Sequence, residues 1–171
     1  MKFYIFLISI GLICACSEEE KQEKKQIEFN NEDSIDLNKQ LLEEENLQID
    51  LYLTHHSQWK MITSGTGLRY QIYQDVKGPL PKLGMKAGFA MKIELLDGTK
   101  CYATPDDMVD EIVVDKSDIE SGILEAVKMM SVGDKAKLIV PAHLAHGITG
   151  DLKSIPPVST LVVDIELISL K

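Results

Sequence analysis

Apolar and polar residues alternate along two stretches in the middle of the chain, and this alternation constrains the fold more than any other feature. The first stretch begins at Leu68 and the second runs from Phe89 to Leu95. Successive side chains of a strand point to opposite faces, so the pattern is typical of antiparallel strands with one buried face. Asp97 and Gly98 follow the second stretch directly and predict a tight turn.

One short helix and two further strands are predicted downstream. Ser117 to Glu120 reads as a capping box, and apolar residues then recur at steps of three or four. The segments KAKLIV (135–140) and TLVVDIELISL (160–170) have the composition of buried strands. Several strands around one helix predict an α+β domain with a curved antiparallel sheet, which we expect over residues 59–171. The expected helix positions are Ile119, Ile123, Val127 and Met130.

An amphipathic helix is predicted over residues 35–58, before this domain. Such a helix packs on its domain or binds a protein partner, and an exposed apolar stripe would favour the partner. The residues that recur on one helical face are Leu41, Leu42, Ile49, Tyr52, Leu53 and His56.

The first sixteen residues, MKFYIFLISIGLICAC, have the features of a bacterial lipoprotein signal. Their apolar run is too short to span a bilayer as a stable helix, and Ala15 precedes Cys16 as in a lipobox. We predict a signal peptide over residues 1–15 and a lipid on Cys16 that anchors the protein in the cell envelope, on the outer membrane, with the periplasmic and the surface-exposed face both open. A plain secretory leader is the alternative. Residues 16–34 are polar and acidic, which predicts a disordered tether.

Charge and cysteine content exclude several classes of function. Of the net charge of −9, most belongs to residues 17–50, and no basic cluster suits nucleic acid. Cys101 is the one cysteine left in the predicted mature chain, where it is expected as a small buried apolar residue rather than a reactive thiol. His143 and His146 have no third ligand nearby in sequence, so no metal site is predicted.

The segment from Ala90 to Lys171 resembles the FKBP family, the peptidyl-prolyl isomerases that bind FK506. LLDGTKCYAT resembles the family's strand, Asp-Gly turn and strand. SGILEAVKMMSVGDKAKLIVP resembles its helix, followed by Met-x-Val-Gly-x-Lys and a strand. LAHGITGDLKSIPPVSTLVVDIELISL resembles Leu-Ala-Tyr-Gly and then Ile-Pro-Pro before the last strand. With the lipobox and the preceding helix, the chain also looks like the FKBP-type lipoproteins associated with gliding motility.

The resemblance implies a half-barrel sheet wrapped around the helix, and an aromatic pocket for a proline ring. It implies no cofactor, and its clients are proline-containing polypeptides. Tyr102 and His146 are then the catalytic, hydrogen-bonding candidates. The substrate-binding candidates are Met91, Cys101, Ile119, Ile123, Ala145, Ile155 and Val163.

The aromatic lining of the family is largely replaced in this chain. Met91 and His146 stand where the family has Tyr, Ile123 replaces a Trp, and Cys101 and Val163 each replace a Phe. Losing on the order of 100 Å² of contact weakens binding by a few kcal/mol. Two functions therefore stay open, which are a weak peptidyl-prolyl isomerase and a non-catalytic FKBP-like binding or assembly module of a membrane-anchored complex.

Overall fold

The computed structural model describes residues 31–171, and the side chains from residue 34 onward. The predicted signal peptide (1–15), the lipidation site Cys16 and nearly all of the tether (16–34) lie outside the described residues. Within the described part of the chain, no helix is both long and apolar enough to cross a membrane.

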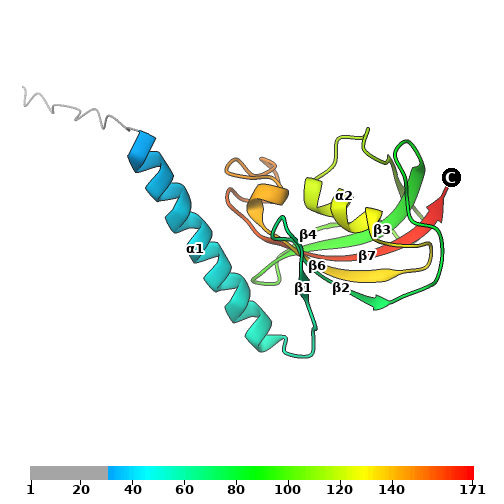
Figure 1. Ribbon diagram of the computed structural model, residues 1–171, viewed down its shortest axis with the longest axis horizontal. Helices are drawn as coiled ribbons and strands as arrows, with labels where there is room; N and C mark the ends of the chain where they lie inside the picture. Colours follow the sequence, from blue (N-terminus) through cyan, green and yellow to red (C-terminus); the bar gives the residue numbers. More distant parts are fainter. Residues whose placement is uncertain (1–30) are drawn as a thin grey trace, which may run out of the picture.

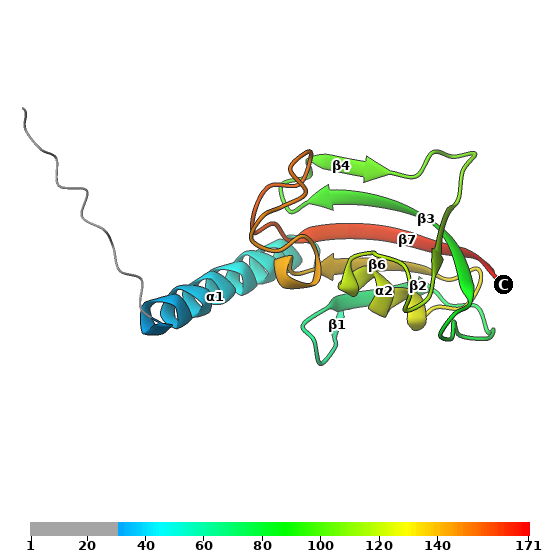
Figure 2. The same ribbon diagram turned by 90° about the horizontal axis from the view of Figure 1, so that it is seen from above.

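Seven strands form one antiparallel sheet that curves around a short helix, as Figures 1 and 2 show. The strand order is β1-β2-β6-β7-β3-β4, and β4 and β5 share the remaining edge of β3. This arrangement confirms the predicted α+β fold. The strands are β1 (Ile62–Thr63), β2 (Arg69–Gln74), β3 (Lys86–Leu95), β4 (Lys100–Ala103), β5 (Asp110–Val113), β6 (Lys135–Val140) and β7 (Leu161–Leu170).

The main core fills the space between the concave face of the sheet and helix α2 (Ser121–Lys128). Ile123 and Val127 of the helix are fully buried against residues such as Phe89 and Val163 of the sheet. Gly122 allows this close packing, because a Cβ there would lie 2.5 Å from a methyl group of Val140. The alternation of apolar and polar residues from Phe89 to Leu95 therefore predicted correctly that Phe89 faces the core.

Helix α2 begins later than the sequence predicts. The predicted capping box starts at Ser117, but the helix starts at Ser121, with Glu120 as an N-cap that makes no side-chain capping bond. The Ser117 hydroxyl instead accepts a hydrogen bond from the backbone N–H of Val113 at 2.8 Å. The capping prediction was wrong because this serine closes a turn after β5.

Helix α1 (Asn31–His55) packs on the convex face of the sheet. Ile139 of β6 and its cross-strand partner Val162 point away from the main core, yet both are buried. Helix α1 accounts for this burial, because Asn46 and Asp50 bond to Arg69 on the same face and Ile49 is fully buried. A small cluster of Tyr52, His56 and Trp59 continues the contact, with Lys137 Nζ lying 5.6 Å from the Trp59 ring.

A buried carboxylate ties helix α1 to the long loop between β6 and β7. Glu45 Oε1 accepts hydrogen bonds from the backbone N–H of Ala142 at 2.7 Å and from the Thr160 hydroxyl at 2.6 Å. Ala142 begins a short 3-10 helix, η1 (Ala142–Leu144), at the start of the loop. Thr160 lies at the end of the loop, directly before β7. The two ends of the loop, called the 141–160 loop below, are therefore fixed to the same side chain.

Candidate functional site

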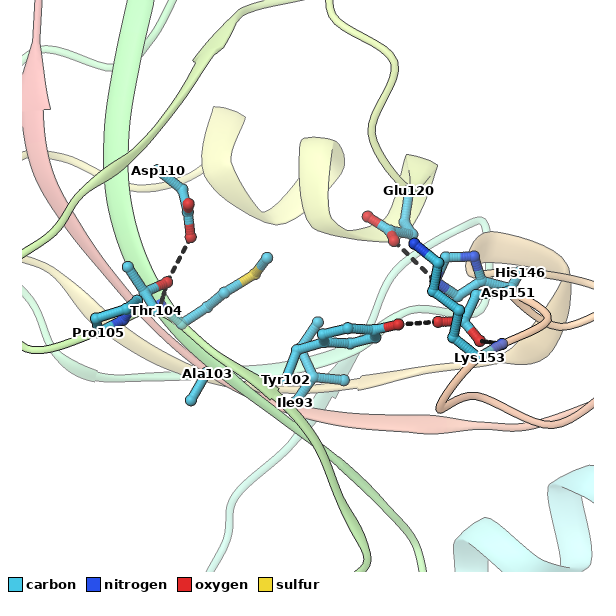
Figure 3. Close-up of a pocket in the computed structure, with 11 residues that line it drawn as sticks. Ile93, Tyr102, Ala103, Thr104, Pro105, Asp110, Glu120, His146, Asp151 and Lys153 are labelled. Carbon is cyan, nitrogen blue, oxygen red and sulfur yellow. Dashed lines mark hydrogen bonds and ion pairs between the residues drawn. The ribbon is translucent and has the colours of Figure 1, made fainter.

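A cavity of about 480 Å³ opens between the β3–β4 hairpin, the start of α2 and the 141–160 loop (Figure 3). Apolar side chains of β3 and β4 form one wall, and polar side chains from the loops form the other. Its lining residues are Met91, Ile93, Tyr102, Ala103, Thr104, Pro105, Asp110, Glu120, His146, Asp151 and Lys153.

A hydrogen bond from the Tyr102 hydroxyl to Asp151 Oδ2 closes one side of the cavity. Asp151 Oδ1 also accepts hydrogen bonds from the backbone N–H groups of Lys153 and Ile155, at 2.9 and 2.8 Å. The Tyr102 bond is the main cause that holds the pKa of Asp151 well below its usual range, and the same bond raises the pKa of Tyr102. Asp151 is therefore a charged acceptor at neutral pH, and the hydroxyl proton of Tyr102 is directed at Asp151.

A contact between a histidine of the loop and a carboxylate at the start of helix α2 forms the opposite side. His146 Nε2 lies 2.9 Å from Glu120 Oε1, and both side chains are largely buried. Figure 3 shows Lys153 alongside His146, on the same side of the cavity. Lys153 supplies a nitrogen donor at this wall, where a bound peptide carbonyl could accept a hydrogen bond, while the Nε2 of His146 is already engaged by Glu120.

A third polar contact fixes the segment between β4 and β5. The Thr104 hydroxyl donates to Asp110 Oδ2 at 2.5 Å and accepts from the backbone N–H of Met91 at 3.0 Å. These two hydrogen bonds hold the edge of the cavity.

The structure brings three of the predicted site residues into the cavity and leaves the others outside its lining. Met91, Tyr102 and His146 line it. Ile123, Ile155 and Val163 are buried in the main core, and Ile119 and Ala145 are partly buried against it. These five side chains support the cavity from behind.

Cys101 lies beside a separate depression on the β3–β4 hairpin, and its Sγ lies 3.5 Å from the carbonyl oxygen of Ser154. Burial is the main cause that raises the pKa of the Cys101 thiol, with the nearby charge of Asp151 as a further cause. Cys101 is only partly buried, so it is less enclosed than the sequence predicts, and the low reactivity of its thiol stays a prediction.

Sequence reasoning missed most of the polar lining. Thr104, Glu120, Asp151 and Lys153 were not predicted as site residues, and the partners of Glu120 and Asp151, which are His146 and Tyr102, lie far away in the sequence. Asp151 had a local signal, since Asp often accepts backbone N–H groups two to four residues later in a loop. Among the described residues, no group of three or more potential metal ligands gathers in one place.

Comparison with known proteins agrees with this geometry. The family model for FKBP-type peptidyl-prolyl cis-trans isomerases matches residues 78–168. The isomerase FkpA of Escherichia coli K12 is 36% identical over 109 residues, which is 64% of this chain and 40% of FkpA. FK506-binding protein 4 of Dictyostelium discoideum is 34% identical over the same length, which is 30% of that protein. The chain therefore matches less than half the length of these relatives.

Two solved structures share the fold. The crystal structure of FkpA from Escherichia coli superposes with a TM-score of 0.66 at 29% identity, over 81% of this chain and 64% of FkpA. A peptidyl-prolyl cis-trans isomerase from Pseudomonas syringae superposes with a TM-score of 0.64 at 22% identity, over 78% and 95% of the two chains. The matched residues 78–168 contain every residue that lines the cavity, so the fold, the cavity and the family model coincide. This chain belongs to the family of FKBP-type peptidyl-prolyl cis-trans isomerases.

Proposed function

We propose that this protein is a peptidyl-prolyl cis-trans isomerase, and that the cavity between the β3–β4 hairpin and the 141–160 loop is its active site. The observation that supports this proposal most is the position of the cavity, since its whole lining falls within the segment that matches the isomerase family. A relative that carries the name FKBP-type peptidyl-prolyl cis-trans isomerase is 36% identical to this chain over 109 residues.

Prolyl cis–trans isomerisation does not require reactive groups in the cavity. Rotation about an X–Pro bond faces a barrier of roughly 20 kcal/mol and breaks no bond. The site accelerates it by binding the twisted amide better than the planar one. Met91, Ile93 and the Tyr102 ring offer an apolar wall for the proline ring, and Lys153 offers a donor for a neighbouring carbonyl beside the His146 ring.

A second function is favoured by the polar pairs of the cavity. Asp110, Glu120 and Asp151 each accept hydrogen bonds at the cavity wall and replace the expected aromatic lining. Covering such groups with an apolar ligand costs desolvation energy, which lowers affinity. A non-catalytic domain that binds protein chains would tolerate this cost, because it needs no tight proline slot.

A refolding assay limited by an X–Pro bond separates the two functions. We expect the wild-type protein to accelerate the slow phase, His146→Ala to reduce the acceleration, and His55→Ala, which changes an exposed histidine of α1, to leave it unchanged. Met91→Tyr should raise it by adding a ring to the wall, since Met91 is partly exposed. Val163 is unsuitable for this purpose, because a Phe there would overpack the core. If the folded proteins do not accelerate the slow phase, the isomerase function is refuted and the non-catalytic binding module remains.

We also propose that the protein works in the cell envelope as a lipoprotein anchored through Cys16. The lipobox-like segment that ends at Cys16 supports this, together with the acidic residues that follow it. Labelling with radioactive palmitate tests it: Cys16→Ser should abolish incorporation, and Cys14→Ser should not. Incorporation into the Cys16→Ser protein would refute the assignment. The resemblance to gliding-motility lipoproteins adds the proposal that its clients serve that machinery, so deletion of the gene should impair gliding.

A further inference from the structure

A second, apolar groove lies on the other side of the 141–160 loop, between the loop and helix α1. It measures about 250 Å³, and we call it the helix–loop groove; apolar side chains dominate its lining, chiefly Leu41, Leu42, Ala142, Ile148 and Val158. Ile148 is 76% exposed and Leu42 is 47% exposed. Apolar side chains gathered around one groove are typical of a binding site for other apolar groups.

The groove is preformed, because its base is fixed. Glu45 lies at the base and its Oε1 binds the backbone N–H of Ala142 and the hydroxyl of Thr160. These bonds hold helix and loop at a set separation. An empty apolar groove between fixed walls binds an apolar side chain without a large cost of reorganisation.

The backbone of the loop is strained where it forms the groove. Val158, which lines the groove, has φ of 54°, in the left-handed region that β-branched residues rarely adopt. The N–H of Val158 donates to the carbonyl oxygen of Gly147 at 2.9 Å, which stabilises this conformation. Strain of this kind is often kept at functional sites, and here it places the Val158 side chain in the groove wall.

The groove and the cavity lie on either side of the same loop. His146 lines the cavity, while Gly147 and Ile148 line the groove. His146 and Ile148 are two residues apart, so their Cα atoms lie within about 7 Å of one another. Figures 1 and 2 agree that the loop lies between α1 on one side and β4 on the other. An extended chain that leaves the cavity over this narrow ridge reaches the groove within a few residues.

We propose that the helix–loop groove binds an apolar side chain of the same polypeptide whose proline enters the cavity. This inference rests on the proposed isomerase function, and it adds a preference to it: clients with a large apolar residue a few positions from the proline. Burial of one such side chain in the groove should tighten binding by about tenfold.

The test uses fluorescein-labelled peptides of Gly and Ser around one Ala-Pro pair. One peptide has no apolar residue, a second has a Phe five residues before the proline, and a third has a Phe five residues after it. The protein is the predicted mature chain, residues 16–171, with Cys16→Ser. Fluorescence anisotropy measures binding, and line-shape NMR of each peptide measures cis–trans exchange. We expect one of the Phe peptides to bind about tenfold more tightly than the plain peptide.

Charged substitutions in the groove should remove this preference alone. Ile148→Glu and Leu42→Glu should bring the Phe peptide to the affinity of the plain peptide, without slowing exchange of the plain peptide, because neither residue lines the cavity. Leu47→Glu is the matched control, since Leu47 is exposed on the other side of α1. Circular dichroism checks that each variant is folded.

Three results distinguish failure of the inference from failure of the proposed function. If all three peptides bind with equal affinity and their cis–trans exchange is accelerated, the inference about the groove is refuted and the proposed isomerase function stands. A Phe preference that Ile148→Glu removes, without any acceleration of exchange, supports the groove as a binding site and refutes the isomerase. Sedimentation that shows a wild-type dimer and an Ile148→Glu monomer assigns the groove to a second copy of this chain and overturns the inference.

Discussion

Replacement of Glu45 by Leu should loosen helix α1 from the domain and destabilise the 141–160 loop. The change leaves two buried donors without an acceptor, the N–H of Ala142 and the hydroxyl of Thr160. Each unsatisfied buried group costs about 1–3 kcal/mol. The apolar side chain of Leu recovers part of that loss, so we expect the free energy of unfolding to fall by about 3 kcal/mol. Urea denaturation followed by the fluorescence of Trp59 measures it, because this single Trp packs beside α1.

Two matched variants isolate the hydrogen bonds from the loss of charge. Glu45→Gln keeps an oxygen that can accept both bonds, and should lose only about 1 kcal/mol. Glu44→Leu changes the neighbouring exposed carboxylate and should alter stability by less than about 0.5 kcal/mol. A Glu45→Leu protein within about 0.5 kcal/mol of wild type would show that the two bonds do not hold the helix, and the reasoning would be wrong.

Three further changes test other parts of the structure. Tyr102→Phe should raise the pKa of Asp151 toward 3.8, as measured by NMR titration of its carboxyl carbon. A carboxyl group whose pKa is lowered in the folded state stabilises the fold at pH values above its pKa in the unfolded state, and this stability is lost as the pH falls. The Tyr102→Phe protein should therefore lose stability at a higher pH than the wild type during acidification. An unchanged titration of Asp151 would contradict this prediction. Gly150→Ala should cost about 2 kcal/mol and lower the melting temperature, because φ is 65° and the new Cβ would lie 2.3 Å from the carbonyl oxygen of Ile155. The thiol of Cys101 should react with Ellman's reagent at pH 8 more slowly than free cysteine, since burial raises its pKa; an equal rate would refute that environment.

The fold could be predicted because its signals are local. Period-two alternation marks which side chains of β3 face the core, and the turn at Asp97 and Gly98 follows from residue type alone. The packed face of α1 was also predictable in outline, since Ile49, Tyr52 and Leu53 of that face are buried or half-buried. The start of α2 was not, because Ser117 could cap a helix or close a turn and tertiary packing decides between them.

The site was harder to predict because its bonds join distant segments. Tyr102 and Asp151 are 49 residues apart, and nothing in either segment indicates the other. Glu45 could have been placed by spacing, since it lies four residues from both Leu41 and Ile49 on the packed face. Its burial was unexpected because a carboxylate is rarely buried unless it is paired, and its partners belong to a loop about a hundred residues away.

Polar pairs in place of aromatic rings change which ligands the cavity favours. Asp110 and Asp151 accept hydrogen bonds from neutral hydroxyl groups, so their negative charges have no cation bonded to them directly. An apolar ring compound that covers these carboxylates removes them from water and returns no hydrogen bond. A polypeptide brings its own N–H donors and can compensate for the lost water. We therefore expect the cavity to bind peptide chains in preference to FK506-like ligands, and we expect a client to gain affinity mainly through contacts beyond the proline, which is the role proposed for the helix–loop groove.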